Sequence, residues 1–288
     1  MREKCFREQV FTKDRIVGQL REMGVKPGDG MVVHTSYKSI GAVEGGPDAV
    51  VDALLEAVGP RGHLMFPAFT FVLDYGLYDP ATTPTNMGVI NETARKRKEF
   101  YRSNFPNHSV IVAGPQAVQI AGDHISRGHL RPGDPFDRLA MMGGYVLLLG
   151  VSFRNNTTGH IGECYADLPH RRQSMEGPYE TLYDKDGECG VYNLSGLPAC
   201  FEGFTAVEGI MRERSHIVDG HVGSAPTKLM KGKDLIFDVV DLARRAPWAL
   251  YCNDPSCGSC VKYRAIATNE YNERKRREGE GWSITARK

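Results

Sequence analysis

The apolar run Tyr145–Leu149 limits the possible folds of this chain more than any other stretch. It is short and almost wholly aliphatic, which is typical of a strand buried on both faces of a sheet. Gly150 ends the run, and a polar turn over 152–158 follows. A helix is predicted to begin near Asn156 or Thr157, because either side chain can accept a hydrogen bond from the first helical turn. Strand, polar loop and helix in this order predict an α/β sheet covered by helices.

Two residues of this predicted helix could carry out acid–base chemistry. His160 lies in the first turn and Glu163 three positions later, so both side chains share one helix face. A carboxylate in that position can hold an imidazole in one orientation, as a general base requires. The alternative is an ordinary solvated first turn, and the spacing alone does not choose between the two.

Further apolar runs repeat the pattern of strand, loop and helix. Short strands are expected at Met31–Val33, Leu64–Phe66 and Val110–Ala113, with amphipathic helices at Lys13–Met23, Ala49–Val58 and Asp234–Arg245. The segment 221–231 is expected to hold a loop and a short strand. These elements predict an α/β fold, a three-layer α/β/α sandwich with a central mixed sheet and a C-terminal elaboration.

Composition limits the class of protein. The 288 residues carry a formal net charge of +1, which does not favour nucleic acid or a membrane surface as a partner. No stretch approaches the roughly 20 apolar residues of a membrane-spanning helix. The charged N-terminus lacks the apolar core of a secretion signal, so a cytoplasmic location is expected. We expect one domain over 1–268, with 185–268 as a candidate subdomain, and a charged, flexible tail over 269–288.

A polar loop after the predicted strand Met31–Val33 is a candidate anion site. It runs from His34 to Gly41 and is followed by Gly45, Gly46 and a helix. Free backbone N–H groups at such junctions bind phosphates. The loop matches no standard nucleotide-binding motif, and an ordinary connection between strand and helix is the alternative.

Four segments in order resemble one known family. They are the loop 33–41 with Glu44-Gly-Gly-Pro, the segment 78–90 with Asp79-Pro, the segment 102–115 with Pro106-Asn-His-Ser109, and Leu147–Val151 with Asn156-Thr-Thr-Gly-His-Ile-Gly-Glu163. Together they resemble the aminoglycoside 3-N-acetyltransferases, from about 15 to 165 and more weakly to 260. The resemblance implies an α/β/α sandwich distinct from the GNAT fold. It also implies acetyl transfer from acetyl-CoA to the 3-amino group of a 2-deoxystreptamine ring.

The resemblance assigns roles to particular residues. The family's base matches His160 and its partner carboxylate matches Glu163. The predicted CoA-binding residues are His34, Thr35, Ser36, Tyr37, Ser39, Ile40, His108, Ser109, Asn156 and Thr157. The chain departs from the family pattern at Arg154, where an acidic residue is common, at Phe105, where a histidine is common, and at Gly159 and Gly162, where larger residues are common.

Direct transfer of an acetyl group needs a free amine. His160, with a reference pKa of ~6.5, suits the removal of a proton from it. Acidic side chains would attract a polycationic acceptor, and the candidates are Asp74, Asp79 and Asp167. Backbone N–H groups at Thr35–Ser36 or at Asn156–Thr157 are both candidates for stabilising the thioester oxyanion. Cys164 as a covalent nucleophile is disfavoured, because direct transfer requires none.

The chain has seven cysteines, which is an odd number. In the reducing cytoplasm expected for this chain, free thiols or a metal site are favoured over a set of disulfides. Cys257-Gly-Ser-Cys260 is a C-x-x-C motif with Cys252 nearby and Cys200 and Cys189 upstream. A structural zinc held by Cys200, Cys257, Cys260 and one further ligand is one interpretation, and free thiols are the other.

Other functions remain open at this point. They are an N-acyltransferase of a biosynthetic pathway that uses another amine, a metal-dependent hydrolase, and a non-catalytic scaffold that binds CoA or zinc. The expected partners are an aminoglycoside and acetyl-CoA, without nucleic acid or membrane, for a monomer or a homodimer.

Overall fold

The computed structural model describes residues 9–70, 78–105, 107–124, 130–175, 179–183, 189–193 and 200–285. Within these ranges seven strands form one mixed sheet in the order β10-β11-β7-β2-β4-β6-β5. Strands β7, β2 and β4 run parallel in its centre, and the outer strands run antiparallel to their neighbours. The strands are β2 (Gly30–Thr35), β4 (His63–Pro67), β5 (Tyr101–Arg102), β6 (Val110–Ala113), β7 (Tyr145–Leu149), β10 (Ile217–Val222) and β11 (Ala225–Lys231).

Alternate residues of the central strands enter two separate cores. In β7, Val146 and Leu148 pack into one core, whereas Leu147 and Leu149 pack into the other. This follows from the two-residue period of a strand, whose successive side chains point to opposite faces. Both faces of β7 are therefore buried, as its uninterrupted apolar run predicts.

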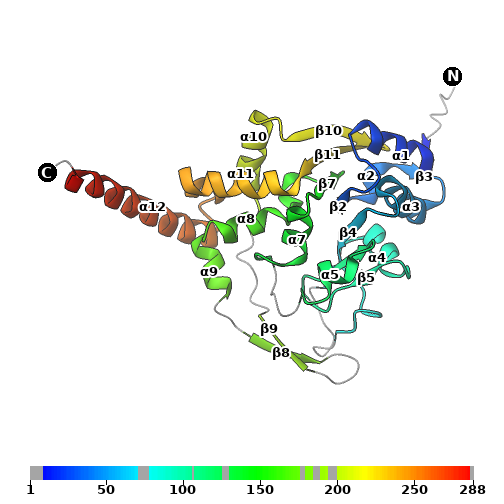
Figure 1. Cartoon of the computed structure of the whole chain (residues 1–288), viewed down its shortest axis with the longest axis horizontal. Helices are drawn as coiled ribbons and strands as arrows, with labels where there is room; N and C mark the ends of the chain where they lie inside the picture. Colours follow the sequence, from blue (N-terminus) through cyan, green and yellow to red (C-terminus); the bar gives the residue numbers. More distant parts are fainter. Residues whose placement is uncertain are drawn as a thin grey trace.

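Helices cover both faces of the sheet, so the predicted three-layer α/β/α sandwich is confirmed (Figure 1). One face carries α1 (Lys13–Glu22), α3 (Gly46–Val58) and α4 (Val89–Arg95). The other face carries α5 (Ala117–Ala121), α7 (Pro135–Met141), α8 (Gly159–Tyr165), α10 (Phe204–Glu213) and α11 (Gly232–Arg245). None of the helices in the described ranges is both long and apolar enough to cross a bilayer.

Shorter elements complete the described chain. They are α2 (Tyr37–Ile40), α9 (Pro169–Met175), the 3-10 turns η2 (Phe153–Asn155) and η3 (Pro247–Leu250), a parallel pair β1 (Val10–Phe11) with β3 (Ala42–Val43), and a hairpin β8 (Tyr179–Tyr183) with β9 (Cys189–Asn193). In the segment 221–231, where a loop and one short strand are predicted, the structure has the end of β10 and all of β11, and β11 pairs antiparallel with β7.

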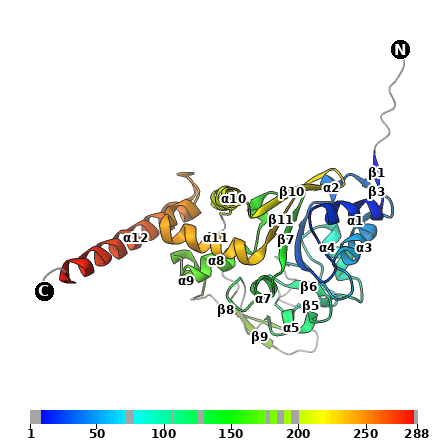
Figure 2. The same ribbon diagram turned by 45° about the horizontal axis from the view of Figure 1, so that its top comes forward.

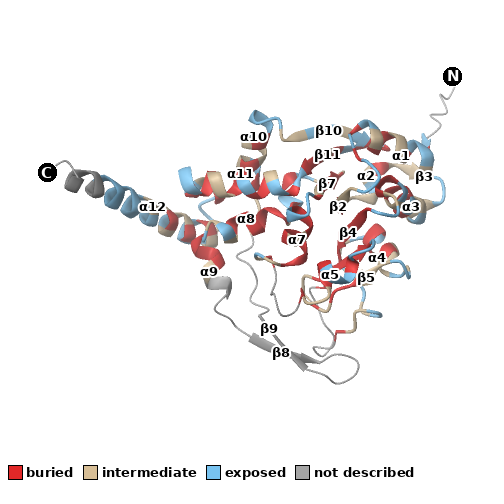
Figure 3. Cartoon of the chain, viewed as in Figure 1, coloured by how far each residue is buried: buried red, intermediate tan, exposed pale blue. Residues whose placement is uncertain are grey.

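Helix α12 (Gly258–Thr285) extends away from the rest of the molecule (Figures 1 and 2). Its first turns bury Cys260, Tyr263 and Ala267, and from Thr268 to Gly279 every residue is half-buried or exposed (Figure 3). The charged segment from Asn269 onward, predicted as a flexible tail, is helical as far as Thr285.

Two glycines explain how closely α8 packs against its neighbours. A Cβ atom on Gly162 would lie 2.5 Å from Cβ of Val239 in α11, and one on Gly159 would lie 3.0 Å from the ring of Phe204 in α10. At Gly162 any side chain would force its surroundings to shift, and at Gly159 the ring of Phe204 would have to give by a few tenths of an ångström. The two glycines therefore let α8, which carries His160, lie close against α10 and α11.

Candidate active site

Helix α8 places His160 and Glu163 in direct contact. Nδ1 of the imidazole lies 2.7 Å from Oε2 of the carboxylate, and the two residues are only 7% and 4% exposed. A solvated first turn is therefore excluded. The helix begins at Gly159, after η2, and its N-cap is Thr158 without a capping side-chain hydrogen bond, so the predicted caps Asn156 and Thr157 were wrong.

The same carboxylate oxygen has two further partners from α9. Nε2 of His170 lies 3.2 Å and Nε of Arg171 lies 2.9 Å from Oε2 of Glu163, and both side chains are buried. Burial alone would raise the pKa of Glu163, but His160, His170 and Arg171 lower this pKa well below its usual range. Glu163 is therefore an anion that holds three side chains together.

His160 is neutral in this environment. Burial of the ring and the charge of Arg171 lower the pKa of His160 to about 4, although Glu163 opposes the shift. Because a carboxylate only accepts hydrogen bonds, Nδ1 of His160 carries the hydrogen, and Nε2 keeps the lone pair. A neutral imidazole with a free Nε2 lone pair is the protonation state that a general base requires.

A cavity of about 520 Å³ opens beside His160. Of the predicted CoA-binding residues, His34, Thr35, His108 and Thr157 line it. The sequence analysis missed several further lining residues, which come from segments far apart in the chain: Phe69, Asn86, Asn91, Asn107, Leu130 and Phe201. Asn91 could not be found from a motif, because its role depends on contacts with Thr35 (3.1 Å) and with the carbonyl of Pro67 (2.7 Å).

The remaining predicted CoA-binding residues do not line this cavity. Ile40 is fully buried in the core below β2, and the hydroxyl of Ser39 bonds to that of Ser36 and to the carbonyl of Gly150. Ser109 donates to the carbonyl of Ala68 in a buried cluster. Tyr37 packs against the α1 and α3 core, and Asn156 is fully buried.

Two of the predicted acidic residues, Asp79 and Asp167, are also absent from the residues that line this cavity. Asp79 accepts hydrogen bonds from Ala81 and Thr82 within its own turn, and Asp167 forms an exposed ion pair with Arg172 at 2.9 Å. Asp74 lies outside the described residues.

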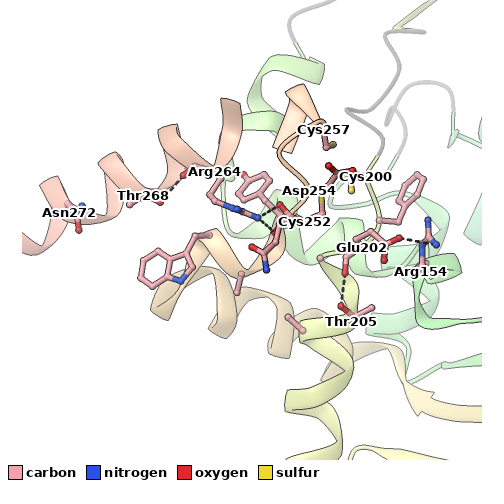
Figure 4. A pocket seen from close by; sticks show the side chains of 17 residues that line it. Arg154, Cys200, Glu202, Thr205, Cys252, Asp254, Cys257, Arg264, Thr268 and Asn272 are labelled. Atoms are coloured by element: carbon pink, nitrogen blue, oxygen red, sulfur yellow. Dashed lines mark hydrogen bonds and ion pairs between the residues drawn. The ribbon is translucent and has the colours of Figure 1, made fainter. Parts of the chain in front are cut away.

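A larger cavity of about 1250 Å³ adjoins the first (Figure 4). Arg154 and Phe201 line both cavities, and Arg154 forms an ion pair with Glu202 at 2.9 Å. Among the described acidic side chains, Glu202 and Asp254 line this second cavity. Sequence reasoning missed both of these acidic groups.

Three cysteines, Cys200, Cys252 and Cys257, line one wall of the larger cavity (Figure 4), and the buried Cys260 lies against them. The sulfur atoms of Cys200, Cys252, Cys257 and Cys260 all lie within 4.8 Å of one another. The sequence analysis named three of these as ligands, and the structure adds Cys252 as the fourth member. We call this group the four-cysteine cluster.

Acidification tests the environment of His34 and His160, two buried histidines that line the cavity. Burial lowers the pKa of His34 to about 3, and the pKa of His160 lies at about 4. In the unfolded chain both titrate near ~6.5, so below that pH the unfolded state binds more protons and the folded state loses stability. From pH 7 to pH 5 each histidine should cost about 2 kcal/mol of unfolding free energy.

Urea unfolding at pH 7 and pH 5 measures this loss. His34→Asn should lose about 2 kcal/mol less than the wild type on acidification. His221→Asn, at an exposed position on β10, should match the wild type. Equal losses in the His34→Asn variant and the wild type would show that the buried ring of His34 already titrates normally.

The sequence also matches a known protein family. The model of the family described as aminoglycoside 3-N-acetyltransferase matches residues 32–243. The chain belongs to this family. The resemblance inferred from four short motifs is thus confirmed over most of the chain.

Individual aminoglycoside 3-N-acetyltransferases match nearly end to end. Aminoglycoside N(3)-acetyltransferase IV of a Salmonella species is 32% identical over 86% of this chain and 93% of its own length. Aminoglycoside N(3)-acetyltransferase VII of Streptomyces paromomycinus is 31% identical over 78% of this chain and 88% of its own. The crystal structure of aminoglycoside acetyltransferase AAC(3)-IVa superposes with a TM-score of 0.78 at 30% identity, covering 90% of this chain and 99% of that one.

Proposed function

We propose that this chain is an acetyl-CoA-dependent N-acetyltransferase that modifies the 3-amino group of the 2-deoxystreptamine ring of aminoglycosides, and so confers antibiotic resistance. The observation that carries the proposal is the buried pair of His160 and Glu163, which faces a cavity inside a chain that belongs to this family. A variant of AAC(3)-IVa in which a histidine is replaced by alanine has been solved with a gentamicin and with apramycin, which supports acceptors of this class.

The reaction needs one base and no covalent intermediate. Nε2 of His160 accepts a proton from the acceptor amine as its nitrogen bonds to the acetyl carbonyl carbon. The carbon–sulfur bond breaks, CoA leaves as a thiolate, and the proton then neutralises that thiolate. Glu163 stabilises the imidazolium that forms in between. The products are an amide and free CoA, so atoms and charge balance.

The donor would enter through the 520 Å³ cavity. His34, Thr35, His108 and Thr157 are the residues we propose to contact the pantetheine arm and the thioester. Cys164 remains unsuited as a nucleophile, because burial raises the pKa of its thiol to about 11 and its sulfur donates to the carbonyl of Leu130. A cytoplasmic location fits acetyl-CoA as donor and reduced thiols in the four-cysteine cluster.

We also propose that the four-cysteine cluster binds a structural zinc ion. Four thiolates at Zn–S distances of about 2.3 Å form a tetrahedron whose sulfur atoms lie about 3.8 Å apart. The observed limit of 4.8 Å between the ligand atoms fits that tetrahedron. Four protein ligands leave no position for water, so such a site is structural, and it does not favour a metal-dependent hydrolase.

Thiol release measured with acetyl-CoA and a panel of deoxystreptamine aminoglycosides tests the proposed function, with mass spectrometry of each acceptor. We expect one acetyl group on the 3-amino nitrogen and one CoA per product. Release with an unrelated amine alone would instead identify a biosynthetic N-acyltransferase. The absence of release with every amine would refute acetyl transfer.

A further inference from the structure

A chain of buried polar contacts, an ion-pair contact followed by a hydrogen bond, extends from the proposed catalytic pair toward the four-cysteine cluster. Nε2 of His170 lies 3.2 Å from Oε2 of Glu163, and Nδ1 of the same ring lies 3.0 Å from the hydroxyl of Tyr251. Tyr251 and His170 are each 6% exposed, and Glu163 is 4% exposed. Neither His170 nor Tyr251 lines the cavity beside His160, so both would act through Glu163.

The chemistry of the groups orients the ring of His170. Glu163 is ionised and can only accept hydrogen bonds, so Nε2 of His170 must carry a hydrogen to be attracted to it. The hydroxyl of Tyr251 bonds to Nδ1, the other nitrogen of the same ring, at 3.0 Å. Tyr251 thereby holds the ring in the orientation that points Nε2 toward Glu163.

Contacts beside the four-cysteine cluster fix the position of Tyr251. Tyr251 precedes Cys252, and its carbonyl accepts a hydrogen bond from Arg264 of α12 at 2.6 Å. Arg264 also donates to the carbonyl of Cys252, whose own N–H donates to the sulfur of Cys260 at 3.4 Å. Tyr251 packs in one small core with Cys260 and Tyr263. The hydroxyl of Tyr251 and the ring of Tyr263, whose centroid lies 6.0 Å from that of His170, thus connect this part of the C-terminal elaboration to His170.

We propose that His170 and Tyr251 are positioning residues for the general base: the hydroxyl of Tyr251 holds the ring of His170, which in turn holds Glu163 against His160. The proposal rests on the proposed acetyl-transfer function. It assigns the C-terminal segment a role in catalysis besides any role in holding metal.

Replacing Tyr251 by phenylalanine removes only the hydroxyl. We expect kcat for thiol release to fall about tenfold, the effect of weakening one hydrogen bond to a charged group. KM for acetyl-CoA and for the acceptor should change less than about twofold, because the hydroxyl that is removed bonds to the buried ring of His170. Tyr165→Phe is the matched control: it lies on the same helix as His160, but its hydroxyl bonds to Asp137 at 3.2 Å, and we expect wild-type kcat.

A double-mutant cycle separates this role from a loss of packing. Glutamine at position 170 can present an N–H to Glu163, but it has no imidazole ring for the hydroxyl of Tyr251 to hold. In the His170→Gln background, Tyr251→Phe should therefore change kcat less than about twofold. The Nδ1 proton of His160, assigned by its loss in His160→Asn, should give a far-downfield NMR resonance that shifts or broadens in Tyr251→Phe and is unchanged in Tyr165→Phe.

The outcomes are distinct. Wild-type kcat in Tyr251→Phe, or an equal loss of kcat in both backgrounds, would overturn the positioning role while leaving acetyl transfer intact. An unchanged His160 resonance in Tyr251→Phe would overturn it as well. If the wild type releases no CoA with any acceptor, the proposed function fails, and the NMR comparison still decides whether Tyr251 orders the pair.

Discussion

Asparagine in place of His160 is expected to lower kcat by about 10²- to 10⁴-fold, the range that general-base catalysis contributes. The side-chain amide of asparagine can still donate to Glu163, now 2.7 Å from Nδ1 of His160, so the carboxylate keeps a partner. Only the lone pair of Nε2 is lost. Binding of acetyl-CoA, measured by calorimetry, should be nearly unchanged. Steady-state thiol release at saturating substrates measures kcat.

A histidine outside the site provides the control. His221 lies exposed on β10 and lines neither cavity, so His221→Asn should keep wild-type kcat and KM. If His160→Asn retained more than about a tenth of wild-type kcat, the base would have to be another group. His34 would then be the first candidate, because it is the other buried histidine that lines the same cavity with a lowered pKa.

Serine in place of Cys260 is expected to remove the bound zinc and to destabilise the C-terminal segment. Cys260 is the buried member of the four-cysteine cluster, and its loss leaves three sulfur ligands. Structural zinc contributes about 10–16 kcal/mol in small zinc domains, so a loss of at least about 5 kcal/mol in that segment is expected. Elemental analysis should fall from one zinc per chain toward none, and α12 should become sensitive to protease.

Cys164→Ser is the matched control for this prediction. Cys164 lies in α8, outside the cluster, and a serine hydroxyl can replace its hydrogen bond to the carbonyl of Leu130. Zinc content and protease resistance should therefore match the wild type. Purified wild-type protein without zinc, and equally resistant after chelation, would show that the four cysteines are free thiols.

Local sequence pattern accounts for the central part of the fold. The apolar run Tyr145–Leu149 predicts a strand with two buried faces, and the period of a strand divides its residues between two cores. The spacing of His160 and Glu163 likewise places both side chains on one helix face, because residues three apart on a helix are neighbours, and the structure then shows that they are in contact. Such features depend only on the geometry of one helix or strand, so a short stretch of sequence is enough to predict them.

Some errors in prediction also have local causes. The helix after β7 was expected at 156 or 157, but η2 takes up the polar turn first. A loop and one short strand are predicted over 221–231, because polar residues interrupt β10 on its exposed face. β10 is nevertheless a strand, because it pairs with β11, which in turn pairs with β7.

What the sequence by itself determined is the class of fold, the family and the pair His160 and Glu163. Tertiary structure alone decided that Glu163 also meets His170 and Arg171, that Tyr251 stands behind His170, and that Cys252 completes the cluster. The reason is physical: periodicity sets which way a side chain leaves its own element, whereas contacts between distant segments depend on how whole elements pack. Eighty-one positions separate His170 from Tyr251, and no local pattern spans that distance.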